Sequence, residues 1–194
     1  MRAWQRMLSG RRLNLLDPSP VDIEITDIAH GLARVARWNG QTSGAYAFSV
    51  AQHSVLVEEL LCLDQPTCPT RWRLAALLHD APEYVIGDMI SPFKSAIGDR
   101  YKGVEAALEA AIHVRFGLPA HLPADAKIAI KRADKVAAFS EAVDLAGFTV
   151  DEARKVLGYR RKARYPGRLM GQPPGVAATE FLDRFHSLSA ELMA

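Results

Sequence analysis

Apolar residues recur at intervals of three and four along most of the chain, a pattern that predicts amphipathic helices. The stripes are regular from about residue 26 to 36, from 101 to 116 and from 177 to 193. Ser49 is a suitable N-cap for a helix through residue 63. We expect helices at residues 26–36, 49–63, 70–80, 101–116, 125–146 and 177–193, and one short helical turn at 151–158.

The segments between these stripes carry turn and breaker signals. Asn39-Gly40 is a strong turn signal, and residues 44–50 fit a short strand or an extended loop. Residues 81–92 are expected to form a loop or a short turn, and the basic, Pro- and Gly-rich segment 160–174 a longer loop. The fold class is therefore all-α, a bundle of six or seven helices with little or no strand.

The length of the chain suggests one domain with a sizeable core. It has 194 residues, of which 49% are hydrophobic and 24% charged, as in ordinary globular proteins. We expect a single domain over residues 1–194, with an N-terminal arm at 1–25, a core at about 26–147, and a basic loop and C-terminal helix at 148–194.

Charge and cysteine content limit the classes of partner. A net charge of +2 gives no field that argues for nucleic acid. No apolar run reaches the length of a membrane span, and the N-terminal stretch is too polar for a signal peptide. The two cysteines, Cys62 and Cys68, form no CxxC pair. A reducing, cytoplasmic setting fits this composition.

An adjacent His79-Asp80 pair ends the apolar run Leu74 to Leu78, just before Pro82. Imidazole and carboxylate are common ligands of divalent metals. Consecutive helix residues point about 100° apart, so the pair can share one ion only if other helices supply further ligands. The structural alternative is that His79 caps a helix end and Asp80 begins a turn.

Two further polar residues interrupt apolar helical patterns, His53 and Asp134. Any one of these residues alone is more often a satisfied core residue than a ligand. Four of them on three separate helices are harder to explain that way. His53, His79, Asp80 and Asp134 together could provide two nitrogen and two oxygen ligands for one divalent ion.

The order His53, then His79-Asp80, then Asp134 resembles the HD-domain phosphohydrolase superfamily. The segments SVAQHS around His53, HDAPEYVIGD from His79 and ADK around Asp134 resemble the branch that contains the 5′-deoxynucleotidases. The resemblance covers residues 26–147. It implies an HD-domain helical bundle and a metal-dependent phosphohydrolase that releases phosphate from (deoxy)nucleoside 5′-monophosphates.

The resemblance also implies roles for residues near the ligand set. Glu83 would act as general acid or base, and Asp88 would orient a water or the sugar 3′-hydroxyl. Arg37 would hold phosphate, and Trp38 would lie against the sugar. Lys94 is a second candidate for phosphate. The structural alternatives are solvated carboxylates, a core tryptophan and surface cations.

One divalent ion is expected as cofactor. The ligand types are compatible with manganese, cobalt, iron, zinc or magnesium. His113 is the only extra histidine near the resemblance, so we interpret it as structural. The expected partner is a small nucleotide, with no membrane and no specific nucleic acid. The apolar terminal helix also suggests a second copy of the chain as a partner, in a homodimer. The alternatives are a deoxynucleoside triphosphate triphosphohydrolase, a non-catalytic nucleotide sensor of the same fold, and a purely structural helical protein.

Overall fold

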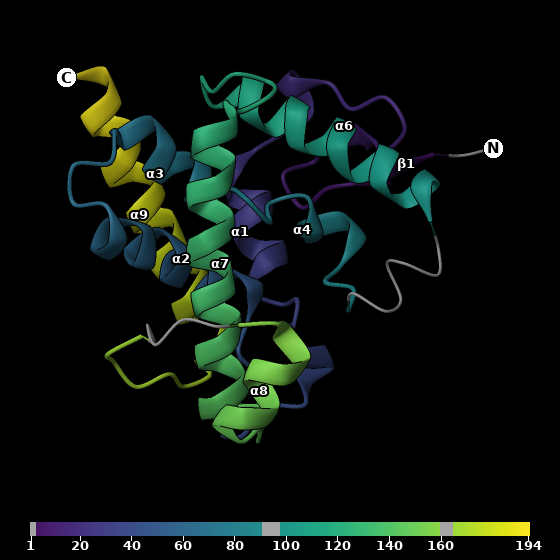
Figure 1. Ribbon diagram of the computed structural model, residues 1–194. Coiled ribbons are helices and arrows are strands. Elements are labelled where there is room, and N and C mark those ends of the chain that lie inside the picture. Colours follow the sequence, from purple (N-terminus) through teal and green to yellow (C-terminus); the bar gives the residue numbers. More distant parts are fainter. Residues whose placement is uncertain (1–2, 91–97, 160–164) are drawn as a thin grey trace.

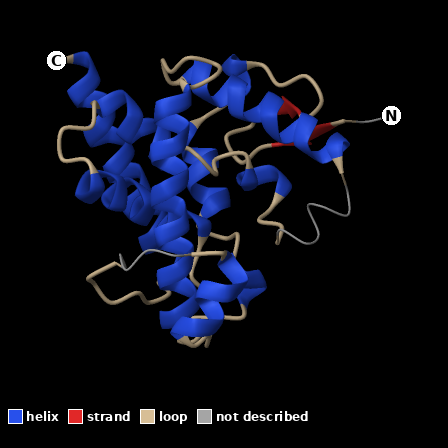
Figure 2. Ribbon diagram, in the orientation of Figure 1, coloured by secondary structure: helices blue, strands red, loops and turns tan. Residues whose placement is uncertain are grey.

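The computed structural model describes residues 3–90, 98–159 and 165–194, and this part of the chain is mostly helical (Figures 1 and 2). Its α-helices are α1 (Ile25–Leu32), α2 (Val50–Asp64), α3 (Thr70–Leu77), α4 (Glu83–Ile86), α6 (Asp99–Arg115), α7 (Ala124–Asp144), α8 (Val150–Leu157) and α9 (Pro174–Met193). Two short 3₁₀ helices, η1 (Pro20–Asp22) and η2 (Arg37–Gly40), flank α1.

Helix α2 lies at the centre of the packing. It packs against α7, α3 and α9 (Figure 1). Val50, Val57 and Leu61 of α2 are almost fully buried as a result. Helix α1 contacts α9 and α4, and α8 packs on α7. Any polar side chain on α2 that faces α7 is therefore removed from water.

The start of α2 forms as the sequence predicts. The Ser49 hydroxyl accepts a hydrogen bond from the Gln52 backbone N–H, and the Gln52 side chain accepts one from the Ser49 N–H. This reciprocal capping box satisfies two backbone donors that the first helical turn leaves without partners. It fixes where α2 begins, and so fixes the face on which His53 lies.

The N-terminal arm is more regular than expected. Strands β1 (Trp4–Arg6) and β2 (Arg12–Asn14) pair antiparallel. Gly10 closes the turn between them at a φ of 90°, a conformation that glycine adopts without a Cβ clash. Leu13 of β2 is completely buried in the core. Three-residue strands are too short to leave an alternating pattern in the sequence.

Two other segments agree with one of the alternatives that the sequence left open. Residues 44–50 form a loop up to the start of α2, and a single bridge joins Ala36 to Ser49. Within residues 81–92, expected to be a loop or short turn, α4 forms one helical turn, which brings the described α-helices to eight, where six or seven were expected. Its single turn is too short to show helical periodicity. The helical content nevertheless agrees with an all-α bundle.

The contact of α1 with α4 depends on Gly31. A Cβ atom at this position would lie 2.8 Å from the Cβ of Tyr84 and 2.9 Å from the Tyr84 carbonyl oxygen. Real side chains do not approach so closely, so only glycine allows this packing. The close contact places α4, and Glu83 at its start, against the core.

Among the described residues, no helix is both long and apolar enough to cross a membrane.

Candidate metal centre

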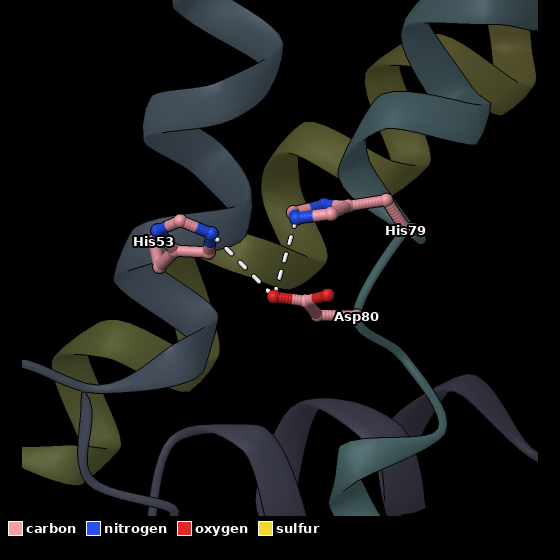
Figure 3. A group of neighbouring side chains, drawn as sticks. All are labelled: His53, His79 and Asp80. Atoms are coloured by element: carbon pink, nitrogen blue, oxygen red, sulfur yellow. Dashed lines mark ion pairs between the residues drawn. The ribbon is translucent and has the colours of Figure 1, made fainter. Parts of the chain in front are cut away.

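Three helices bring the predicted ligands together. His53 lies on α2 and is fully buried, Asp134 lies on α7, and His79 and Asp80 directly follow α3. Figure 3 shows the two imidazoles on opposite sides of the Asp80 carboxylate. One ligand atom from each of His53, His79 and Asp80 lies within 4.8 Å of the other two. Three of the four predicted ligands thus converge, and this group does not include Asp134.

The hydrogen bonds of the two histidines direct their Nε2 atoms inward. His53 Nδ1 lies 2.5 Å from Glu141 Oε1, and His79 Nδ1 lies 2.8 Å from the Ala76 carbonyl oxygen. Both partners are acceptors, so each Nδ1 carries the proton and donates. In the neutral ring this leaves a lone pair on Nε2. Among the described residues, neither Nε2 has a hydrogen-bond partner although both are buried.

The separations inside the cluster suit a shared ion. Asp80 Oδ2 lies 3.5 Å from His53 Nε2 and 3.2 Å from His79 Nε2 (Figure 3). Asp134 Oδ1 lies 3.3 Å from His53 Nε2. Bonds of about 2.0–2.2 Å to one ion place neighbouring ligand atoms about 3.0–3.5 Å apart. The donor set and its spacing therefore fit a divalent cation, and Asp134 lies beside His53.

The carboxylates of the cluster remain ionised. Burial disfavours the charged form of Asp80, but the neighbouring imidazoles hold its pKa well below the usual range. Asp134 shows the same balance, and among the neighbouring groups His53, 3.3 Å away, lowers its pKa most. Burial and the Arg37 charge oppose protonation of His53, but the carboxylates around it raise its pKa to about 10. The cluster thus requires positive charge, from either a proton or a cation.

Glu141 is a site residue that sequence reasoning missed. Its carboxylate is fully buried; Oε1 accepts the bond from His53, and Oε2 accepts bonds from Trp38 Nε1 at 2.9 Å and Arg37 Nε at 3.2 Å. Burial opposes its ionisation, but these partners hold its pKa at about 2. Glu141 follows Asp134 by seven residues on α7, two helical turns along the same face. That spacing was the available signal.

The Arg37-Trp38 pair forms one wall of the cluster. Arg37 Nη1 donates to Asp88 Oδ2 at 2.9 Å, and the nearby carboxylates raise its pKa despite burial. Trp38 and Asn39 have φ values of 56° and 51°, in the left-handed region that bulky residues rarely occupy. Residues held this way cluster at functional sites. The centres of the Trp38 and Phe148 rings lie 5.7 Å apart.

A cavity of about 560 Å³ opens beside the cluster, a size suited to a small ligand. Arg37, Trp38, Glu83, Asp88 and Lys131 line it together with Asp80 and Asp134. Glu83 begins α4 and is only 3% exposed. The predicted catalytic and substrate-binding residues therefore surround one cavity, apart from Lys94, which lies outside the described residues.

A second cavity, of about 620 Å³, borders the cluster from the side of α6. It shares Asp80, Glu83 and Asp134 with the first cavity, so the cluster lies between the two. His113 of α6 is buried, and burial lowers its pKa. Among the described residues, the potential metal-binding group does not include His113, in keeping with the structural role expected for it.

The described part of the chain is thus a mostly helical protein with a His-His-Asp group that could hold a metal ion. The uncharacterized protein RCAP_rcc00048 of Rhodobacter capsulatus is 58% identical over 192 residues, which cover 98% of both chains. The uncharacterized protein YfdR of Escherichia coli K12 is 33% identical, over 87% of this chain and 85% of its own. The chain belongs to the family of these two proteins. No protein-family model matches it.

Proposed function

We propose that this protein is a metal-dependent phosphohydrolase of the HD-domain type that releases phosphate from (deoxy)nucleoside 5′-monophosphates. One observation carries the proposal. The Nε2 atoms of His53 and His79 face one oxygen of Asp80, at the border of a cavity that Glu83 and Arg37 also line. Ligands for a hard or borderline cation, an acid–base carboxylate and an anion-binding guanidinium thus share one cavity.

His53, His79, Asp80 and Asp134 would hold the ion. When bound there, a divalent cation lowers the pKa of a water molecule and offsets charge on a phosphate oxygen. The rest of the chemistry belongs to side chains. Glu83, buried at the start of α4, exchanges a proton with the attacking water or with the leaving oxygen.

Arg37 and Asp88 position the substrate. The contacts to Asp88 and Glu141 use two of the five N–H donors of the guanidinium. The remaining donors suit phosphate oxygens, for which the planar fork of arginine is well shaped. Trp38, fixed by Glu141 and lying by Phe148, offers an apolar ring to the sugar. Asp88 orients a water or the 3′-hydroxyl.

The decisive experiment is a panel of nucleoside mono- and triphosphates assayed with several divalent metals. Wild type, Glu83→Ala and Glu58→Gln are compared, since Glu58 is a buried carboxylate that does not line either cavity. We expect free phosphate from monophosphates with wild type and Glu58→Gln. If Glu83→Ala releases phosphate at the wild-type rate, Glu83 does not have the acid–base role given to it. Triphosphate as product identifies a triphosphohydrolase, and binding without turnover identifies a sensor.

A further inference from the structure

A single carboxylate connects the candidate metal centre to the wall of the substrate cavity. Glu141 uses its two oxygens for different partners: Oε1 for the His53 imidazole at 2.5 Å, and Oε2 for the Trp38 indole at 2.9 Å and the Arg37 guanidinium at 3.2 Å. The residue is fully buried, so water does not replace any of these partners. A change in the position or charge of His53 therefore alters the hydrogen bonds that Glu141 makes with Trp38 and Arg37, and the reverse also holds.

The chemistry of these partners requires a carboxylate at this position. The indole N–H and the guanidinium are donors only, and His53 also donates, through Nδ1. All the groups that face Glu141 need an acceptor, on both of its oxygens. A glutamine has one acceptor oxygen and one donor NH₂ group. In either orientation of the amide, its NH₂ group would face a donor on one side.

The backbone on the cavity side needs support. Trp38 and Asn39 occupy the left-handed region, which stays populated only when the surroundings over-determine it. The bond from the indole to Glu141 is one such support, and a backbone bond from Gln41 N–H to the Trp38 carbonyl oxygen is another. Glu141 thus fixes the shape of the Arg37-Trp38 turn as well as the orientation of the imidazole.

We propose that Glu141 is a positioning residue that couples cation binding at His53 to the conformation of the Arg37-Trp38 turn. This inference rests on the metal centre of the proposed function. It adds that the substrate-facing wall responds to the cation through one side chain, before any substrate is present. Hydrogen-bonded partners of a ligating histidine commonly change metal affinity about 10- to 100-fold when they are altered.

The test compares Glu141→Gln with Glu58→Gln. Glu58 is also fully buried and also bonded to arginines, but it contacts no residue of the candidate centre. Two measurements are made without substrate: Zn²⁺ affinity by calorimetry, and the NMR signals of the indole N–H groups during the Zn²⁺ titration. The chain has three tryptophans; Trp38→Phe assigns the signal of Trp38, and the other two serve as internal references.

In wild type we expect the Trp38 signal to move as Zn²⁺ binds while the signals of Trp4 and Trp72 stay. Glu141→Gln should weaken Zn²⁺ binding about 10- to 100-fold and remove the coupled shift. Glu58→Gln should keep the affinity within about twofold, as distant sites do. Equal affinities in the two variants, or an unaltered Trp38 response in Glu141→Gln, would overturn the coupling.

The two proposals fail in different ways. A wild type that binds no divalent cation removes the metal centre and this coupling with it. If wild type and Glu141→Gln bind Zn²⁺ with equal affinity, the metal centre stands and only the coupling is contradicted. If Glu141→Gln does not fold, Trp38→Phe replaces it, because that change takes one donor from Glu141. It should weaken Zn²⁺ binding about fivefold, the value of one hydrogen bond, and unchanged affinity contradicts the proposal.

Discussion

Helices α2 and α7 each bury one glutamate completely, and the two glutamates have different surroundings. Glu58 of α2 is bonded to Arg73 at 2.8 Å, to Arg184, and to the Cys62 thiol at 3.2 Å. These contacts join α2 to α3 and α9. Each partner is a donor, and the arginine side chains, 26% and 28% exposed, reach water. We call Glu58, Arg73 and Arg184 the structural cluster.

Glu141 differs because one of its partners is an imidazole. A guanidinium has donors only and offers no lone pair to a metal ion, whereas an imidazole that donates through Nδ1 presents a lone pair at Nε2. At His53 that lone pair faces two more carboxylates, Asp80 and Asp134. A buried carboxylate alone thus does not mark a site. The informative feature is a histidine between carboxylates at the edge of a cavity.

The largest difference between the candidate metal centre and the structural cluster should appear when Asp80→Asn is compared with Glu58→Gln. The change keeps the size of the side chain but removes the charge that faces both imidazoles, so metal retention and phosphate release should become undetectable. Glu58→Gln should retain both. Metal content of the purified proteins and phosphate release measure the effect. Full activity in Asp80→Asn would place the chemistry elsewhere in the molecule.

Glu83→Gln should separate chemistry from metal binding. Glu83 lines both cavities and lies three residues after Asp80. We expect kcat to fall about 100- to 10,000-fold, the usual contribution of a general acid or base, while bound metal stays at the wild-type level. Loss of metal together with activity would mean that Glu83 supports the ligands and does not exchange protons.

The Glu58→Gln variant should lose stability without losing function. Its two arginines would keep an amide partner in place of a charged one, which should cost about 1.5–3 kcal/mol in the free energy of unfolding. Urea unfolding followed by circular dichroism measures this cost. Metal affinity that falls along with stability would contradict the separation of the structural cluster from the candidate centre.

The sequence was sufficient to predict some features of the structure and not others, for physical reasons. His53 and Asp134 stand out because each interrupts an apolar helical stripe, and the structure brings them to 3.3 Å. The N-cap at Ser49 depends on local sequence and was predicted, and the structure confirms it. Helix α4 and the N-terminal hairpin are too short to show a period. The predicted homodimer and hydrolase activity stay predictions.

Other features depend on contacts between distant residues. Glu141 pairs with Arg37 across 104 positions of the chain, and no local pattern reports such a partner. The left-handed conformation of Trp38 is equally non-local, because the Glu141 bond and the Phe148 ring help to hold it. The periodicity of a single sequence does not show which buried carboxylate pairs with Arg37 and Trp38. Substitutions that occur together in related sequences carry that information.

The smallest expected effect concerns Cys62, whose thiol is bonded to Glu58 of the structural cluster. Burial, followed by the hydrogen bond to Glu58, raises the pKa of the Cys62 thiol to about 11. Glu58→Gln removes the negative charge, so the pKa should fall and more thiolate should be present in mildly alkaline buffer. Alkylation of Cys62, followed by mass spectrometry, should become about threefold faster, which corresponds to about half a pKa unit.

Cys68 provides the internal reference for this measurement. Burial is the main cause of its raised pKa, its thiol bonds to the Pro69 carbonyl oxygen, and Glu58 acts on it only through space. Its alkylation rate should therefore change less than that of Cys62. An equal acceleration of both cysteines would indicate general loosening of the α2–α3 region, and the direct Glu58–Cys62 contact would then not control the thiol.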